Sequence, residues 1–560
     1  MKANLKTILI KLNNSNFLFV LSLTILTIMT GYTYGKHDQA LYIPLINKIL
    51  NPALYTRDAF THLINNESAS FFKLLSPFFR VVGVEVGFFI LYITGFAVLI
   101  LSSFLIGKYI FKKRNAGYVF ALVVMASRMP TLSQETFFAT RNLIIPLLLL
   151  AVYFFLKNKY LLSYFLIGIL ANFHQISSIS LLVILGFVHL IFIKSIGIKK
   201  TLFSILVFII GFSPTILQIL SGNSTKIILT VDENWYKFQR LLTNVNYSIF
   251  YPEGTESTIS FLATLFGSFI IFVLLRKYRK LVSKEFKQAY DKLSFIILFT
   301  IIFQIIVALI YRVYPAVILV QLQLIRASTY ITIFTAFGLG ALIYLFYVNK
   351  KINKTQAVFS FFLFYYGFLV YTALFLLLPI KKLIPKIIVF LVVIVGLFGF
   401  AQTFLLTRGY IPGQGSLYST DNELIDLQLW MKKNTSVDSL FLAPTNIDDV
   451  TSGNIRVISE RNILFTPSEL WMNIIDYLNY PTIVGILDDI SHGKATQAID
   501  QVDSWKLFSD VMTISYRNLT NSDIVKLKNK YSINYFIAYS ENIYSFKNVY
   551  SNSKFTVYKL

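Results

Sequence analysis

Long apolar runs separated by short polar loops fill the first 405 residues of the chain. We expect membrane-spanning helices at 16–34, 84–107, 116–128, 142–157, 161–173, 177–194, 201–220, 259–275, 293–312, 328–348, 355–378 and 386–405. About 20 apolar residues cross the hydrocarbon core of a bilayer, because an α-helix rises roughly 1.5 Å per residue. The runs at 116–128 and 161–173 are shorter than this, which suits tilted or re-entrant helices. The pattern therefore predicts an α-helical polytopic bundle of about 12 or 13 transmembrane helices.

The first long interruption of this pattern, residues 35–83, contains two amphipathic runs. In "ALYIPLINKIL" (40–50) and "SFFKLLSPFFRVV" (70–82) the apolar residues recur at spacings that form one face of a helix. A helix of this kind lies in the membrane interface rather than crossing the bilayer. We expect a first outer loop with two juxtamembrane helices.

The composition changes after residue 406, where no run is long enough to span a membrane. The segment "RGYIPGQGS" is typical of a linker. The chain thus divides into a transmembrane domain, 1–405, and a small extra-membrane α/β domain, 406–560. In the second domain we expect a helix capped at Thr420 or Asp421, a strand at "SLFLAP", a strand or hairpin at "NIRVISERNILF", a helix with the Thr520-x-x-Asp523 capping pattern, a buried strand at "INYFIAY" and a hairpin at "NVYSNSKFTVYKL".

Composition supports a membrane protein and narrows its classes. The 560 residues are 56% hydrophobic and 14% charged, with a mean hydropathy of +0.64, whereas soluble domains carry about 25% charge. The net charge of +24 comes largely from short Lys/Arg-rich loops, as the positive-inside rule requires, so nucleic-acid binding is a poor explanation. The chain has no cysteine, which excludes disulfides and thiolate sites. Its richness in Asn, Lys and Ile suggests a bacterial source and hence the plasma membrane.

The basic loops set the expected topology. With the N-terminus in the cytoplasm, the outer loops are 35–83, 129–141, 174–176, 221–258 and 313–327. Twelve crossings would leave the C-terminal domain inside and the lysines of 379–386 outside. A thirteenth crossing within 313–327 would reverse both, so we expect an odd number and a C-terminal domain on the outer, periplasmic side.

Polar residues stand where the first span ends. They are Lys36, His37, Asp38 and Gln39. A carboxylate at the membrane edge can accept a proton or hold a metal ion, and Asp38 equally suits an N-cap of the next helix. Lys36 and His37 suit either an anionic substrate or interface anchoring. Asp58 suits either a site or an ion pair with the adjacent Arg57.

The later outer loops add further candidates. Glu135 lies between Arg128 and Arg141, and two acids from two loops could share a divalent cation, because hard cations bind oxygen ligands. Arginines bind phosphate in a bidentate manner, although a local ion pair explains this loop equally well. His174, between two short spans, suits a functional role or helix packing. Arg326 in "LVQLQLIRAS" is a cation in an apolar stretch, which is costly unless it meets an anion or reaches the interface.

Several catalytic classes lack their motifs. The sequence contains no P-loop, no GxSxG, no HExxH and no Cys/His cluster. Charges within the predicted spans are few, which argues against an ion pump.

The combination of a polytopic bundle, a long first outer loop with an acid at its start, and a C-terminal α/β domain resembles the GT-C class of integral-membrane glycosyltransferases. In that class a long first outer loop carries an acid and two juxtamembrane helices, and a soluble domain often follows the bundle. More closely, "GYTYGKHDQALYIPLINKILNPALYTRDAF", "LQLIRAS", "LQLWMKKNTSVDSLFLAP", "IRVISERNILF" and "VYSNSKFTVYKL" are similar to a group of bacterial polytopic membrane proteins with that architecture.

The resemblance implies roles for individual residues. Asp38 and Glu135 would be the catalytic acids, with Mg²⁺ or Mn²⁺ as the metal they would share. Lys36, His37, Gln39, Asp58, Arg141, His174 and Arg326 would bind substrate, the last three at the lipid phosphate. The chain departs from the class pattern because Asp38 is followed by Gln39 rather than by a second acid.

The resulting hypothesis is a membrane glycosyltransferase that uses a polyprenyl-phosphate-linked sugar and an envelope or surface acceptor. Inversion in one displacement needs a single base, unlike the two carboxylates of glycosidases. The alternatives are a flippase or transporter of lipid-linked glycans, and a non-catalytic envelope assembly protein. Membrane lipids and the lipid-linked donor are the expected partners.

Overall fold

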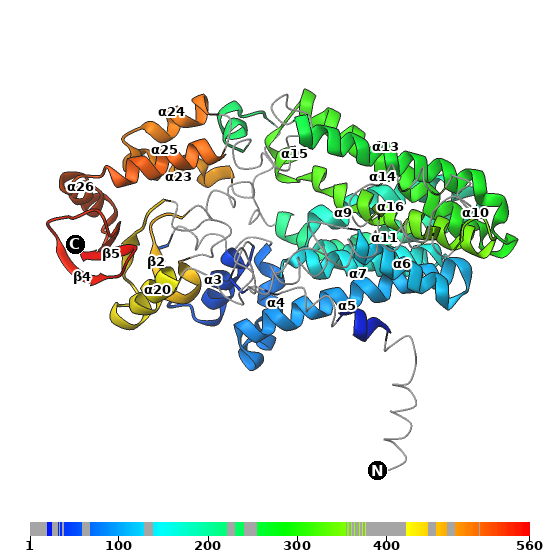
Figure 1. Cartoon of the computed structure of the whole chain (residues 1–560), viewed down its shortest axis with the longest axis horizontal. Helices are drawn as coiled ribbons and strands as arrows, with labels where there is room; N and C mark the ends of the chain where they lie inside the picture. Colours follow the sequence, from blue (N-terminus) through cyan, green and yellow to red (C-terminus); the bar gives the residue numbers. More distant parts are fainter. Residues whose placement is uncertain are drawn as a thin grey trace, which may run out of the picture.

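The computed structural model describes most of the chain. The described residues are 19–24, 32, 34–35, 38–58, 68–127, 138–220, 230–239, 255–353, scattered positions between 356 and 376, 422–445, 455–466, 477–502 and 505–560. Two bodies are visible in Figure 1: a bundle of long helices, and a C-terminal domain of a small sheet with helices. The two bodies meet around α3 and α20.

Apolar helices build the bundle. They are α5 (Val84–Phe111), α6 (Arg114–Ala126), α7 (Thr140–Leu156), α8 (Tyr160–Ala171), α9 (Gln175–Ile191), α11 (Ile198–Leu220), α13 (Thr255–Tyr278), α14 (Lys287–Val313) and α16 (Ser328–Val348), with the short α10 (Ile193–Ile196), η3 (Arg279–Leu281) and η4 (Lys284–Phe286) between them. Among the described residues, five helical stretches are long and apolar enough to cross a membrane, and α6, α7, α8 and α9 are shorter apolar helices. The predicted membrane bundle is confirmed.

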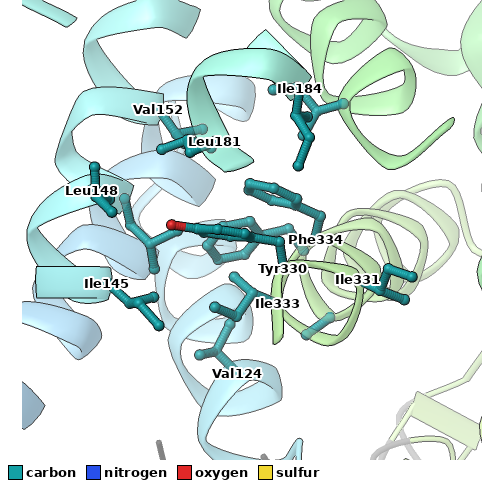
Figure 2. Packing of buried hydrophobic residues seen from close by; sticks show 14 of the residues in the cluster. Val124, Ile145, Leu148, Val152, Leu181, Ile184, Tyr330, Ile331, Ile333 and Phe334 are labelled. Carbon is teal, nitrogen blue, oxygen red and sulfur yellow. The ribbon is translucent and has the colours of Figure 1, made fainter. Parts of the chain in front are cut away.

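Helix α16 passes through the middle of the bundle. Tyr330 and Phe334 lie among the aliphatic side chains of Leu148, Leu181 and Ile184 from α7 and α9, as Figure 2 shows. The Tyr330 hydroxyl donates a hydrogen bond to the Ser177 carbonyl at 3.0 Å. That bond ties α16 to the first turn of α9, beside His174.

The two expected helices of the first outer loop are present. They are α3 (Gln39–Leu50) and α4 (Ser68–Val82). Helix α3 buries Ile43 and Ile46 completely, whereas α4 exposes Leu74 and Val81. An exposed apolar side on a short outer helix suits the membrane interface.

The C-terminal domain is built on a five-stranded sheet in the order β2-β1-β3-β5-β4. Its elements are α20 (Asn422–Asn434), β1 (Leu440–Leu442), α21 (Arg456–Ser459), β2 (Asn462–Ile463), η7 (Tyr477–Asn479), α23 (Tyr480–Ser491), α24 (Lys494–Gln501), α25 (Trp505–Arg517), α26 (Asn521–Tyr531), β3 (Tyr535–Tyr539), β4 (Lys547–Ser551) and β5 (Phe555–Lys559). β1 runs parallel to β2 and β3, and β5 is antiparallel to β3 and β4.

Most of the predicted elements of this domain are confirmed. The Thr520–Asp523 capping box begins α26, and β4 with β5 forms the C-terminal hairpin. The segment 454–465 was expected as a strand or hairpin, and this is wrong for its first half. There α21 makes a single helical turn, and only β2 is extended. The predicted division at 405/406 falls outside the described residues and stays a prediction.

The thirteenth crossing expected within 313–327 is wrong. This segment forms α15 (Val317–Gln321) and η5 (Leu324–Ala327), which are far too short to cross a bilayer. Tyr311 of α14 holds the segment at the end of the bundle. The Tyr311 hydroxyl donates to the Leu319 carbonyl and accepts the Leu324 amide N–H.

The C-terminal domain lies at the same end of the bundle as the first outer loop. Two outer segments hold it there: residues 55–58, described below, and the helical segment 233–239. Phe238 of the latter is fully buried in the core of the C-terminal domain, between Tyr480 and Phe508. The C-terminal domain and the first outer loop thus lie at one end of the bundle, and the periplasmic side of both stays a prediction.

Candidate functional site

Asp38 and Arg141 form an ion pair where two helices begin. Asp38 precedes the first turn of α3 and Arg141 lies in the first turn of α7, and their Oδ2 and Nη1 atoms are 2.5 Å apart. The Asp38 side chain makes no capping hydrogen bond to α3, so the helix-cap interpretation does not account for it. The carboxylate is 31% exposed, and it can therefore reach both Arg141 and a further group.

Two neutral hydroxyl groups, which the sequence reasoning missed, support this pair. Thr140 donates a hydrogen bond to the Tyr42 hydroxyl at 3.0 Å. Burial raises the pKa of Tyr42 above its ordinary value, and the charge of Asp38 raises this pKa further. The spacing could have suggested Tyr42, because residues four apart on a helix share a face.

His174 lies in the turn between α8 and α9 and caps α9. Its Nδ1 accepts the Ser177 backbone N–H at 3.3 Å. The pKa of His174 is lowered to about 4, first by burial and then by the charges of Arg141 and Arg326. The imidazole is therefore neutral at pH 7, with Nδ1 as an acceptor.

Arg326 belongs to the short η5 turn, which follows Gln323. Gln323 is buried and adopts a left-handed conformation with φ +42°. The positive charge of Arg326 lowers the pKa of both His174 and Tyr42, and η5 packs against α9, the helix that His174 caps. Within the described residues, Arg326 has no acidic ion-pair partner.

Side chains from α3, α7, the α8–α9 turn and η5 thus meet at one end of the bundle. Three of them, Asp38, Arg141 and His174, were chosen from the sequence in three different outer loops, and Arg326 comes from a fourth. Two guanidinium groups face one carboxylate and a neutral imidazole. The described groups carry a net positive charge, which an anion can balance.

Gln39 supports this site from inside the fold. Its side chain is fully buried, with Oε1 accepting the Gly35 N–H at 2.8 Å and Nε2 donating to the Tyr32 hydroxyl at 3.0 Å. Both ends of the amide are occupied. The structure thus corrects the expected substrate contact, and Gln39 instead joins the start of α3 to Gly35 and Tyr32.

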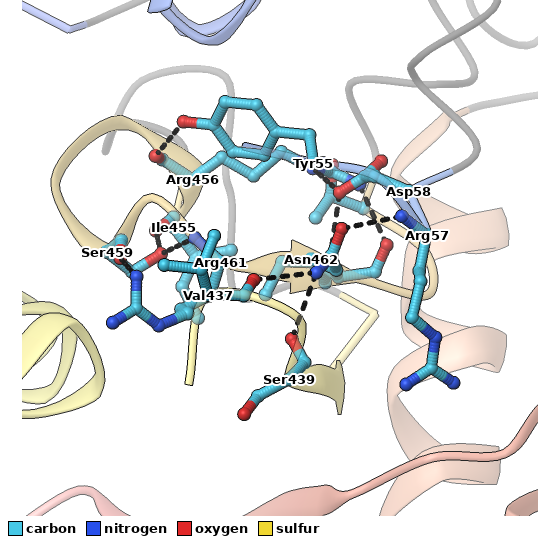
Figure 3. Close-up of polar contacts among 12 residues, drawn as sticks. Tyr55, Arg57, Asp58, Val437, Ser439, Ile455, Arg456, Ser459, Arg461 and Asn462 are labelled. Carbon is cyan, nitrogen blue, oxygen red and sulfur yellow. Dashed lines mark hydrogen bonds and ion pairs between the residues drawn. The ribbon is translucent and has the colours of Figure 1, made fainter. Parts of the chain in front are cut away.

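Asp58 also lies elsewhere than expected. Its carboxylate binds Arg456 of α21 through two hydrogen bonds of 2.7 and 3.0 Å, and it accepts the Ile463 N–H at 3.0 Å (Figure 3). Both side chains of the pair are 0% exposed, so Asp58 has no surface for substrate. The expected ion pair with Arg57 is replaced by this partner in the other domain.

The remaining candidates, Lys36, His37 and Glu135, lie outside the described residues, and their roles stay predictions. The same holds for the metal ion expected between Asp38 and Glu135. In the described part of the chain, no group of three or more His, Asp or Glu side chains could hold a metal ion.

No family model and no curated protein matches the sequence. Among solved structures, the chain is similar to the crystal structure of ArnT from Cupriavidus metallidurans in the apo state. The likeness covers 97% of each chain at 10% sequence identity, with a TM-score of 0.40.

Proposed function

We propose that this membrane protein is a glycosyltransferase. It would transfer a sugar from a polyprenyl-phosphate donor to a glycan, lipid or protein acceptor of the cell envelope or surface. One observation carries the proposal: a partly exposed carboxylate, Asp38, lies beside Arg141 and close to Arg326 and His174 at one end of an apolar bundle.

Phosphate is the anion that best suits this arrangement. A guanidinium presents planar, paired N–H donors that match phosphate oxygens. Arg326 has no acidic partner among the described residues. The donor's tail would lie in the bilayer, so that its phosphate would reach the membrane edge where these side chains meet. The exposed apolar side chains of Leu74 and Val81 on α4 suit such a lipid-facing position.

The proposed step uses Asp38 as the base. Its carboxylate takes the proton of the acceptor hydroxyl as the acceptor oxygen forms a bond to the anomeric carbon of the donor sugar. The bond from that carbon to the phosphate oxygen breaks, and polyprenyl phosphate leaves with the electron pair. The configuration at the anomeric carbon is inverted.

Arg141 and Arg326 would stabilise the charge that develops on the leaving phosphate. In the structure Arg141 is paired with Asp38. When the donor phosphate binds, Arg141 can exchange one anionic partner for another, which leaves Asp38 free to accept the proton. A shared Mg²⁺ or Mn²⁺ on Asp38 and Glu135 stays a prediction, and no step is assigned to it.

The experiment is release of polyprenyl phosphate by the purified protein in lipid, with a panel of polyprenyl-phosphate sugars and candidate acceptors. We expect release by the parent and no release by Asp38→Asn. Glu85→Gln is the matched control, because Glu85 is an exposed acid at the same end of the bundle.

The other outcomes separate the alternatives. Donor binding without release by the parent would favour a flippase or transporter of lipid-linked glycans. Equal release by the parent and Asp38→Asn would retain the enzyme and remove Asp38 as its base. Neither release nor binding would favour a non-catalytic assembly protein.

A further inference from the structure

The C-terminal domain binds a short stretch of the first outer loop, residues 55–58. The Tyr55 hydroxyl donates to the Arg456 carbonyl at 3.0 Å. The Arg57 backbone N–H donates to Asn462 Oδ1 at 2.9 Å, and its guanidinium donates to Asn534 Oδ1 at 2.9 Å. Figure 3 shows Tyr55, Arg57 and Asp58 meeting this domain from one side.

The backbone of this stretch is held in an uncommon conformation. Tyr55 is buried and has φ +53°, in the left-handed region that bulky residues rarely adopt. Such a conformation persists only where the surroundings fix it. Here the contacts to α21 and β2 supply that constraint.

The buried pair of Asp58 and Arg456 is the centre of the contact. Arg456 also donates to Thr466 Oγ1 at 2.7 Å and to the Ile463 carbonyl at 3.1 Å. Removing one partner of such a pair leaves an uncompensated buried charge. The loop and α21 are therefore fixed to each other in one orientation.

The same turn of α21 also lies against Gly35, which precedes α3 in the chain. Gly35 has φ +83°, and a Cβ built on it would lie 3.3 Å from Val457 Cγ1. Gly35 in turn donates its backbone N–H to the side chain of Gln39, the residue next to Asp38, at 2.8 Å. Gly35 therefore links α21 of the C-terminal domain to the start of α3.

We propose that α21 is a positioning element for Asp38: Arg456 anchors the first outer loop, and Val457, packed against Gly35, orders Gln39 and with it the adjacent Asp38, whose carboxylate is paired with Arg141. The importance of this order for catalysis rests on the proposed function. The attachment of the loop to α21 and the order of the residues at the start of α3 do not rest on the proposed function, and both can be measured without any enzymatic activity.

The chain contains no cysteine, so a single introduced cysteine can be labelled specifically. In Val457→Cys the only thiol lies at the contact with Gly35, and its rate of maleimide labelling reports whether α21 stays attached. In Leu41→Cys a spin label lies in the first turn of α3, beside Asp38, and its mobility in an EPR spectrum reports order there. Each cysteine is combined with Arg456→Met.

The control removes an arginine of the same domain that does not touch the loop. Arg517 forms an exposed ion pair with Glu541 at 3.0 Å, so Arg517→Met should change neither labelling nor mobility. Where Arg456→Met fails to fold, the double variant Asp58→Asn/Arg456→Met replaces it, because that variant leaves no unpaired buried charge.

We expect Arg456→Met to raise the labelling rate at position 457 and the mobility at position 41. We also expect a fall of roughly 100-fold in kcat for sugar transfer with little change in KM for the donor, because small misplacements of a reacting group have effects of that order. Unchanged labelling, or faster labelling without increased mobility at position 41, would overturn the proposal. So would full activity with a detached α21.

If the parent transfers no sugar, the proposed function fails by itself. Labelling and mobility then decide the positioning proposal alone. An increase in both supports it, and the lack of an increase in either one of them contradicts it.

Discussion

At the residue scale, Arg141 and Arg326 of the candidate site differ in their ion-pair partners. Arg141 is paired with Asp38 at 2.5 Å, whereas Arg326 has no acidic ion-pair partner among the described residues, and its charge acts on the neutral side chains of Tyr42 and His174. A cation beside an apolar bundle is costly unless an anion balances it. Arg326 is therefore the better probe of an anionic ligand.

We expect Arg326→Ala to weaken the binding of donor or of polyprenyl phosphate by about 10- to 100-fold, because a hydrogen bond to a charged group contributes about 1.5–3 kcal/mol. Arg326→Lys should recover only part of this, since an ammonium lacks the paired donors. Isothermal titration in lipid measures the affinity. Arg80→Ala, an exposed arginine of α4, is the control, and an equal effect of the two alanine variants would contradict an anion site at Arg326.

His174 makes a pH-dependent contribution to stability. Its pKa is lowered to about 4, first by burial and then by Arg141 and Arg326, whereas an exposed histidine titrates near pH 6.5. Below about pH 6.5 the unfolded chain therefore binds a proton that the folded chain does not bind. The stability is complete above that pH and is lost as the pH falls toward 4.

We expect His174→Asn to reduce this loss. Asparagine keeps an acceptor for the Ser177 N–H and has no proton to gain. The apparent unfolding temperature should therefore fall less between about pH 7.5 and about pH 4.5 in the variant than in the parent. His492→Asn is the control, because His492 is exposed and its left-handed backbone tolerates asparagine. A parent-like pH dependence in His174→Asn would show that another group is responsible.

At the element scale, the sequence predicted those helices and strands whose apolar pattern repeats over many residues. The long apolar runs gave the bundle, and Thr520 with Asp523 gave the start of α26. The segment "NIRVISERNILF" suggested a strand or hairpin, but so short a run does not distinguish a strand from one helical turn. The helical turn forms instead of a strand because it buries Ile455 in the domain while Val457 packs against Gly35.

The approach of α8 to α11 depends on glycine. A Cβ on Gly168 would lie 2.4 Å from the Phe208 carbonyl oxygen and 3.2 Å from Gly211 Cα. Small residues allow helices in a membrane to approach closely. We expect Gly168→Ala to destabilise the bundle by about 1–3 kcal/mol, as overpacking does.

Gly186 of α9 offers the matched control, because a Cβ there meets nothing within 4 Å. Gly186→Ala should be neutral or should stabilise the protein by up to about 1 kcal/mol through helix propensity. The apparent unfolding temperature in detergent or nanodiscs compares the two variants. Equal shifts would mean that the close contact of α8 and α11 does not limit stability.

At the scale of the whole molecule, the sequence did not indicate which side chains join the two domains. Asp58 and Arg456 are 398 positions apart, and no local spacing relates them. Asp58 accordingly looked like a partner of Arg57 or a substrate ligand. Candidate site residues such as Asp38 and His174 were easier to choose, because a polar group at the end of an apolar run stands out in the sequence by itself.

The second attachment of the C-terminal domain provides a separate test of this arrangement. Phe238 is fully buried between Tyr480 and Phe508 of that domain, although it belongs to the outer segment between α11 and α13. Truncating a buried phenylalanine costs about 3–5 kcal/mol. We expect Phe238→Ala to lower the unfolding temperature of the C-terminal domain and to expose it to limited proteolysis while the bundle stays folded.

Lys237→Ala is the control from the same helical turn. Lys237 forms an exposed ion pair with Asp500 at 3.0 Å, and exposed pairs contribute at most about 1 kcal/mol. If proteolysis of Phe238→Ala matches that of Lys237→Ala, the C-terminal domain does not depend on the outer segment for its core. If Phe238→Ala alone is cleaved, the fold of this domain is completed by the bundle, and the side chains near Asp38 then depend on both bodies of the molecule.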